Sequence, residues 1–217
     1  MKKALCLALI ALLCLGLAGC GTVYINIYED LPKANATITM EDGSVMRFVL
    51  DEACAPNTVA NFTVLANSGF YDGMKIDYIY PGWFLRSGDP DDNGRGGAGY
   101  TIDGEFKENG FELNVISHSF GVISMCRYDD DYNSASSQFF IMLGNHSYDY
   151  DGKYAAFGYI DLNDEETVNT LKALSNVTLD YNYKPLLRQT IATIRVETNG
   201  VEYQVVKSGE TVNGGNN

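Results

Sequence analysis

The sequence of 217 residues predicts a mainly β protein, folded as a closed antiparallel barrel with two helices covering its ends. Many short apolar runs, separated by clusters of Gly and Asp, have the length and alternation of strands. Only two segments have the apolar spacing of a helix. The chain shows no internal repeat and no linker, and its length suits one domain with a sizeable core.

The first elements are a hairpin and a helix. The alternating runs 36–40 and 44–50 flank an Asp-Gly pair at 42–43, which is a strong indication of a hairpin turn. Pro56 suits the first turn of a helix, because the N–H that proline lacks would be unpaired there. Apolar residues follow at helical spacing until Gly69, where we expect the helix to end.

Short strands and a second helix follow. Strands are expected at 75–80, 83–86, 121–125, 138–143 and 154–160. The sequence Asn163-Asp164-Glu165-Glu166 supplies a capping side chain and negative charge to the start of a second helix. The run 190–198 alternates again and predicts a final strand.

The amino terminus predicts export and lipidation. A basic start at 1–3 precedes an apolar run at 4–18 that is too short to span a bilayer comfortably, which is typical of a signal peptide. Leu17-Ala18-Gly19-Cys20 resembles a bacterial lipobox, in which Cys20 carries the lipid and becomes the first residue. The alternative is an ordinary signal peptide cleaved near Gly19.

We therefore expect a protein anchored by lipid to the cell membrane on its extracytoplasmic side. Its segments would be a signal peptide at 1–19, a lipidated tether at 20–34, a folded domain at 35–200 and a polar tail at 201–217. The stretch 22–28 alternates, which favours an edge strand or a docked tether over a flexible stalk.

Composition argues against several functions. The formal net charge of −13 argues against nucleic acid as a partner and against a basic patch that docks on anionic lipid. With His118 and His146 as the only histidines, a zinc site or a Ser-His-Asp triad is not expected, and we predict no metal. Cys54 and Cys126 lie in the folded body, and the sequence leaves open whether they pair.

Gln138 is the most informative residue, because it precedes Phe139 and Phe140 in an otherwise apolar strand. A buried amide needs a hydrogen-bond partner. An amide beside aromatic rings suits a site that holds another peptide bond next to an apolar ring, as in an X-Pro dipeptide. The alternative is a structural hydrogen bond within the protein.

A series of short motifs occurs in order along the chain: APNTVANF at 55–62, GFYDG at 69–73, PGWF at 81–84, GDP at 88–90, GG at 96–97, YTI at 100–102, GEF at 104–106, GVISM at 121–125, SQFFI at 137–141 and DGKYAAFG at 151–158. Together they resemble the cyclophilin-type peptidyl-prolyl cis-trans isomerases, in the bacterial lipoprotein form. The resemblance spans roughly 36–197 and implies a closed eight-stranded antiparallel barrel capped by two helices.

The implied chemistry is rotation about an amide bond. The X-Pro barrier of about 18–20 kcal/mol comes from C–N double-bond character, whereas cis and trans differ by only about 0.5–1 kcal/mol. In the twisted state the proline nitrogen gains a lone pair, so a donor aimed at it binds that state best. No covalent step, proton transfer, metal or cofactor is needed.

The resemblance also implies a groove. The residues expected to line the proline pocket are Phe84, Met125 and Phe140, for which the alternative is plain barrel core. The residues expected elsewhere in the groove are Gln138 on the substrate backbone, Cys126 and Arg127 beside the residue before proline, and Tyr150 and Tyr154.

The sequence departs from the family at the catalytic arginine. The family has Phe-His-Arg before the Ile-x-Pro-Gly turn, and this chain has Ile76-Asp77-Tyr78. Tyr78 therefore replaces the arginine. Asp77 replaces the histidine and is expected among the substrate-binding residues. A neutral hydroxyl is a weaker donor than a charged group, and we expect it to stabilise the twisted amide less by about 1–2 kcal/mol.

Arg86 replaces the groove glutamine of the family, on the opposite arm of the same hairpin. We hypothesise that Arg86 has taken over as donor to the prolyl nitrogen while Tyr78 orients it, which gives Tyr78, Arg86 and Gln138 as catalytic residues. In the alternative, Arg86 pairs with Asp77 or Asp89 and the site is slow or inactive.

These observations predict a monomeric isomerase that assists the folding of secreted proteins and acts on proline-containing peptides or unfolded secreted chains. The alternative is a non-catalytic proline-peptide-binding or chaperone lipoprotein, and a third possibility is a scaffold with a blocked groove. The segment 89–94 imitates half of a calcium loop, but Tyr100 stands where the last ligand would be, so a turn is expected. The acidic run 129–131 suggests a solvated loop beside the groove, able to select basic peptides.

Overall fold

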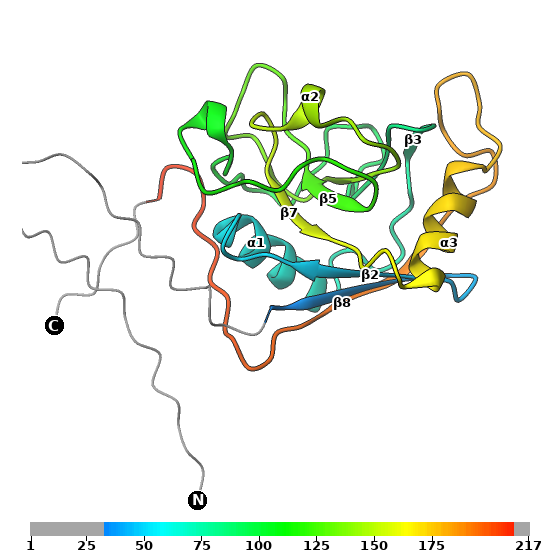
Figure 1. The fold of residues 1–217 in the computed structure, drawn as a ribbon, viewed down its shortest axis with the longest axis horizontal. Coiled ribbons are helices and arrows are strands. Elements are labelled where there is room, and N and C mark those ends of the chain that lie inside the picture. Colours follow the sequence, from blue (N-terminus) through cyan, green and yellow to red (C-terminus); the bar gives the residue numbers. More distant parts are fainter. Residues whose placement is uncertain (1–32, 211–217) are drawn as a thin grey trace, which may run out of the picture.

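The computed structural model describes residues 33–210, which form one eight-stranded antiparallel sheet and three α-helices (Figure 1). The sheet order is β3-β4-β6-β5-β7-β2-β1-β8. The strands are β1 Asn35–Met40, β2 Val45–Leu50, β3 Tyr78–Tyr80, β4 Phe84–Ser87, β5 Val122–Met125, β6 Phe139–Met142, β7 Ala156–Tyr159 and β8 Ile191–Glu197. The helices are α1 Pro56–Asn67, α2 Ser147–Tyr150 and α3 Glu165–Ser175, with a short 3₁₀ turn at Lys107–Asn109.

The locally encoded elements are where the sequence predicts them. The β1–β2 hairpin turns at Gly43, whose φ of 87° is readily adopted only by glycine. α1 begins at Pro56, and α3 is capped by the Asp164 carboxylate, which accepts a hydrogen bond from the Thr167 N–H. Each expected strand overlaps an observed one. The signal peptide, Cys20 and the stretch 22–28 lie outside the described residues.

The prediction of a closed barrel is wrong. β3 and β8 are the two edges of the sheet, and they do not pair with each other. β3 has only three residues, and the N–H of Ile79 donates to the carbonyl of Tyr183, in the loop before β8, at 2.9 Å. The segment before β3 bridges the gap instead: Lys75 pairs with Thr190, and the N–H of Ile191 donates to the carbonyl of Met74 at 2.7 Å. The sheet is therefore an open half-barrel.

The prediction of two helices also missed α2. Its four residues make a single turn, which is too short to show a helical period in the sequence. In Figure 1, α2 lies on the side of the sheet away from α1. Among residues 33–210, no helix is long and apolar enough to cross a membrane.

The main core lies between the inner face of the sheet and the helices α1 and α3. Phe62 of α1 packs its ring against Phe139 at 5.5 Å and against Phe157 at 5.1 Å, and all three side chains are fully buried. Leu171 and Leu174 of α3 belong to the same core. Burying rings of this size supplies much of the apolar stabilisation of a domain.

A second apolar cluster covers the outer face of the same strands. Because side chains alternate along a strand, β6 sends Phe139 and Ile141 inward and Phe140 and Met142 outward. The outward side chains pack with Val122, Ala156 and several partly buried aromatic residues. This outer face carries most of the residues predicted to bind substrate.

The segment after β8 is tied to the domain. The side chain of Asn57 exchanges two hydrogen bonds with the backbone of Val206, at 2.8 and 2.9 Å. The Tyr203 hydroxyl donates to Glu52, and the Ser208 N–H donates to the Thr101 carbonyl at 2.8 Å. The part of the expected polar tail that the structure describes is therefore docked beside α1 (Figure 1).

We expect a chain that ends after Gly200 to be less stable by about 2–4 kcal/mol, because each lost hydrogen bond contributes roughly 0.5–1.5 kcal/mol and buried Glu52 loses a partner. Urea unfolding, followed by the fluorescence of Trp83, measures this. A chain that ends after Glu210 is the control and should match the full chain. Equal stability of the two truncated chains would contradict a structural role for residues 201–210.

Candidate functional site

Three neighbouring strands carry the candidate site on their outer face. β4 contributes Phe84 and Arg86, β6 contributes Phe140 and is preceded by Gln138, and β5 is followed by Cys126. Arg86 lies opposite Phe140 in the β4–β6 ladder. Phe84 and Phe140 lie in an aromatic cluster at one end of the site, while Arg86 and Gln138 line a pocket at the other.

The aromatic cluster consists of Phe84, Phe140, Tyr150 and Tyr154. The Phe140 ring lies 5.6 Å from Phe84, 5.5 Å from Tyr150 and 5.5 Å from Tyr154, measured between ring centroids. Phe140 is buried, whereas the other three rings are partly exposed. Burial raises the pKa of Tyr150 to about 12, so its hydroxyl remains protonated at neutral pH. The structure thus brings together four of the predicted groove residues as an apolar wall.

Met125 does not belong to this wall, which corrects its predicted place in the proline pocket. Its side chain is only 1 % exposed and packs in the main core with Ile123. Strand alternation places it on the opposite face from Cys126, which packs against the aromatic cluster. The alternative of plain barrel core holds for this residue.

A hydrogen-bonded series of polar side chains, Asp151, His118 and Ser124, supports the aromatic cluster from beneath. The His118 Nδ1 lies 2.9 Å from the Asp151 carboxylate, and its Nε2 lies 3.1 Å from the Ser124 hydroxyl. The imidazole stacks on the Phe140 ring at 6.0 Å. Burial lowers the pKa of His118 despite the opposing effect of Asp151, which favours a neutral ring.

The three residues have the order of a catalytic triad, but Ser124 is fully buried and cannot reach a substrate. These three side chains therefore position Phe140 and perform no nucleophilic chemistry. No local pattern indicated this arrangement, because Asp151 lies 33 residues from His118 in the sequence.

Arg86 is fixed by a buried carboxylate. Its guanidinium contacts both oxygens of Asp77, at 3.3 Å through Nε and at 2.5 Å through a terminal nitrogen. The Asp77 side chain is 3 % exposed and that of Arg86 is 26 % exposed. Asp77 therefore holds Arg86 and is too buried to bind substrate, which corrects its predicted role. Burial opposes the charge of Arg86, but the hydrogen bond and charge of Asp77 outweigh it and raise the pKa of the guanidinium.

Tyr78 supports this arginine through its ring. Tyr78 and Arg86 face each other in the β3–β4 ladder, and the Arg86 Cζ lies 5.6 Å from the Tyr78 ring centroid. Tyr78 also stacks on Phe84 at 5.8 Å, which joins it to the aromatic cluster. Tyr183, from the loop before β8, packs against Tyr78 at 5.8 Å and extends the wall. Nothing in the sequence of that loop indicated this contact.

The Gln138 amide has a partner within the protein. Its Nε2 donates to the Gly96 carbonyl at 2.8 Å, which is the structural hydrogen bond of the alternative interpretation. Within residues 33–210 its amide oxygen accepts no hydrogen bond, so it is available to a substrate N–H. Gln138 therefore links the groove to the glycine-rich loop and presents an acceptor.

Arg127 and Cys126 border the groove without reactive chemistry. The Arg127 guanidinium lies over the rings of Tyr154 at 4.5 Å and Tyr132 at 4.8 Å, and its Nε donates to the Lys153 carbonyl. These contacts hold Tyr154 in the aromatic cluster. Burial raises the pKa of the Cys126 thiol to about 12, and neither Cys126 nor Cys54 forms a disulfide.

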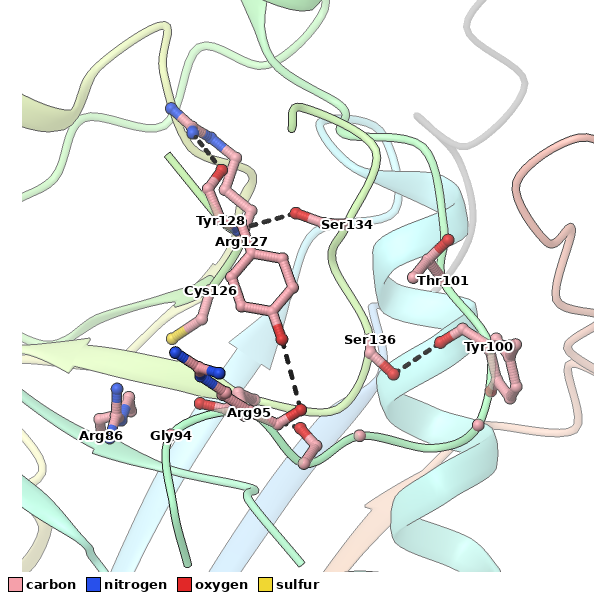
Figure 2. A pocket seen from close by; sticks show the side chains of 14 residues that line it. Arg86, Gly94, Arg95, Tyr100, Thr101, Cys126, Arg127, Tyr128, Ser134 and Ser136 are labelled. Carbon is pink, nitrogen blue, oxygen red and sulfur yellow. Dashed lines mark hydrogen bonds between the residues drawn. The ribbon is translucent and has the colours of Figure 1, made fainter. Parts of the chain in front are cut away.

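A pocket of about 360 Å³ opens beside Arg86 and Gln138 (Figure 2). One wall is the glycine-rich loop 94–99. The Tyr128 side chain reaches this loop, and its hydroxyl donates to the Arg95 carbonyl at 3.3 Å. The loop is built around Asp89, whose carboxylate accepts hydrogen bonds from the backbone N–H groups of Asp91, Asn93 and Gly94. The apparent calcium motif is therefore a turn, and residues 33–210 contain no group of three or more residues arranged to hold a metal.

The fold and the groove together define a class of protein. An antiparallel half-barrel that carries an aromatic wall, an amide and a fixed guanidinium on its outer face suits the recognition of a proline-containing peptide. The family model for cyclophilin-type peptidyl-prolyl cis-trans isomerases matches residues 36–196. The chain belongs to this family, which confirms the predicted function class.

Similar proteins support this assignment. Peptidyl-prolyl cis-trans isomerase B of Bacillus subtilis (strain 168) is 43 % identical over 103 residues, which cover 48 % of this chain and 67 % of that protein. An isomerase of Synechococcus elongatus is 34 % identical over 141 residues, covering 65 % and 88 % of the two chains. A crystal structure of a Cryptosporidium parvum cyclophilin, determined in the presence of the dipeptide Ala-Pro, superposes with a TM-score of 0.64 at 27 % identity and covers 76 % of this chain and 99 % of that one.

We expect Asp77→Asn to lower the free energy of unfolding by about 1–3 kcal/mol, because it leaves Arg86 without its carboxylate partner in a mostly buried site. Asp91→Asn, at an exposed position with the same loss of charge, is the control and should stay within about 0.5 kcal/mol of the wild type. Urea unfolding measures both. If the two variants are equally stable, the pair contributes nothing.

Proposed function

We propose that this protein catalyses cis-trans isomerisation of X-Pro bonds, with Arg86 as the donor to the prolyl nitrogen. The observation that carries the proposal is the position of the Arg86 guanidinium. It lies across the ladder from Tyr78, where the family has its catalytic arginine, and it lines the pocket next to the aromatic cluster. The charge lost at position 78 is thus replaced from the facing strand.

The groove favours the twisted amide in three ways. The rings of Phe84, Phe140, Tyr150 and Tyr154 offer an apolar wall to the pyrrolidine. The amide oxygen of Gln138 can accept from the substrate backbone. Arg86, already oriented by Asp77, keeps N–H groups on the edge that faces the pocket. Such a preorganised donor is worth most when the proline nitrogen becomes pyramidal.

The second candidate function is proline-peptide binding without catalysis. The same ion pair favours it, because Asp77 engages two nitrogens of the guanidinium and partly neutralises its charge. A binding module of this kind would hold proline peptides against the aromatic cluster without changing the rate of isomerisation.

We expect Arg86→Ala to lower kcat/KM by about 10- to 100-fold, which corresponds to the loss of one charge-assisted hydrogen bond of about 1.5–3 kcal/mol. Exchange between cis and trans signals of an X-Pro peptide, observed by NMR, measures the rate without a coupled protease. Arg188→Ala, at an exposed arginine outside the groove, is the control.

The double variant Tyr78→Arg with Arg86→Gln restores the family arrangement and should be at least as active as the wild type. Equal rates for the wild type and Arg86→Ala would refute the role of Arg86. Peptide affinity without any rate in the wild type would favour the binding module.

We further propose that the protein is a monomeric lipoprotein that acts on secreted proteins outside the cytoplasm. Support comes from the basic start, the short apolar run and the sequence Leu17-Ala18-Gly19-Cys20, with the domain at 35–200 following a short tether. Proline-containing segments of newly exported chains would then meet the groove close to the membrane face.

Cys20→Ser should abolish lipidation, because the thioether needs the sulfur atom, and should move the protein from the membrane fraction to the soluble fraction. Mass spectrometry of the amino-terminal peptide and cell fractionation measure the two effects. Cys54→Ser is the matched control. An unlipidated amino terminus in the wild type would show that the leader is an ordinary signal peptide.

A further inference from the structure

The pocket beside Gln138 is basic although the protein as a whole is strongly acidic. Arg86, Arg95 and Arg127 line it, and none of its lining residues is Asp or Glu. The chain carries a formal net charge of −13, so this concentration of positive charge is local. A pocket of this character attracts an anion.

The three arginines differ in how far their guanidinium groups are already engaged within the protein. Asp77 neutralises Arg86. Arg127 donates to the carbonyls of Lys153, Tyr128 and Asp129, and Figure 2 shows its guanidinium directed away from Arg86 and Arg95. Arg127 is therefore committed to the structure of the protein, and Arg86 to Asp77 and to its proposed role at the prolyl nitrogen.

Arg95 is different. It is exposed, and among residues 33–210 its guanidinium forms no ion pair. Its backbone is held on both sides, since its N–H donates to the Asn93 side chain and its carbonyl accepts from the Tyr128 hydroxyl. Arg95 thus presents a free cation from a fixed position on the wall of the pocket.

The two serine hydroxyl groups of the pocket do not compete for this role. Ser136 donates to the Tyr100 carbonyl at 2.6 Å and accepts from the Ala98 N–H. Ser134 donates to the Asp131 carbonyl and accepts from the Tyr128 N–H. The proton of each serine hydroxyl is therefore engaged within the protein, and the guanidinium groups supply the positive charge offered to a ligand.

The pocket lies two residues along the strands from the aromatic cluster. Phe84 and Arg86 lie two residues apart on one face of β4. Phe140 and Gln138 are also two residues apart, at the start of β6, and Phe140 lies opposite Arg86. Two residues of a strand span about 6.6–7 Å, and an extended client peptide has the same rise. A side chain within two positions of a bound proline therefore reaches the pocket.

We infer that this pocket is a specificity subsite for a carboxylate, the side chain of an Asp or Glu within two residues of the client proline, with Arg95 as its partner. The inference rests on the proposed function, because it concerns the same groove. The acidic residues 129–131 do not oppose it: Asp129, Asp130 and Asp131 are exposed, lie outside the pocket lining and are screened by solvent. The site selects acidic peptides, the opposite of what that run suggested.

The test compares pairs of X-Pro peptides that differ only by Glu against Gln, placed one or two residues before or after the proline. NMR exchange at low ionic strength gives kcat and KM. In the wild type we expect kcat/KM to be about 5- to 10-fold higher for Glu at one of these positions, mainly through KM, because a charge-assisted contact replaces a neutral one. The preference should shrink at high salt.

In Arg95→Gln the Glu/Gln ratio should fall to about one, and in Arg95→Glu a Lys peptide should become the preferred one. Arg188→Gln changes the net charge by the same amount outside the groove and should keep the wild-type ratio. Equal values for Glu and Gln at every position, or a ratio that survives in Arg95→Gln, would overturn the inference.

If the protein accelerates cis-trans exchange of none of the peptides, the result would instead contradict the proposed catalysis. Calorimetry then measures the affinities of the same peptide pairs and tests independently whether the pocket prefers Glu. Tighter binding of Glu peptides that Arg95→Gln abolishes supports the subsite, and equal affinities in the wild type reject it.

Discussion

The alternation of side chains along β4, β5 and β6 is the constraint on which the rest of the structure depends. Each strand must fill the main core with one set of residues and furnish the outer face with the next. Leu85, Ile123 and Ile141 pack inward, while Phe84, Phe140 and Cys126 pack outward. A slip of one residue in any of these strands would exchange the two sets and destroy core and groove together. Stability and recognition are thus encoded in alternate residues of the same strands.

The Arg86–Asp77 pair shows how the site adapts to a changed sequence. A guanidinium in a mostly buried position needs a carboxylate to compensate for lost hydration. Asp77 provides it from the position just before β3, which carries Tyr78, so the two departures from the family sequence act on one side chain. The same pairing orients the arginine and partly neutralises its charge. Under the proposed function, the balance between these two effects sets the rate of X-Pro isomerisation.

The groove relies on segments far from it in the sequence. The His118–Asp151 pair sits behind Phe140, and Arg127 holds Tyr154 by stacking on its ring. The segment after β8 contacts Tyr100, which lines the pocket: Lys207 lies over the Tyr100 ring at 5.1 Å. Long-range contacts of this kind allow an exposed glycine-rich loop to keep a defined shape and to present Arg95.

The sequence by itself determined the hairpin, α1, α3 and the approximate strand positions, because turn chemistry, capping and a period of two are local properties. The expected groove residues came instead from the resemblance of its motifs to the cyclophilin family. Only the tertiary structure decided that the barrel is open, that Met125 faces the core, that Asp77 rather than Asp89 pairs with Arg86, and that Tyr183 and Arg95 belong to the site. Each of these depends on which residues distant in the chain meet in space. No local pattern specifies such meetings, since they result from packing of the whole domain.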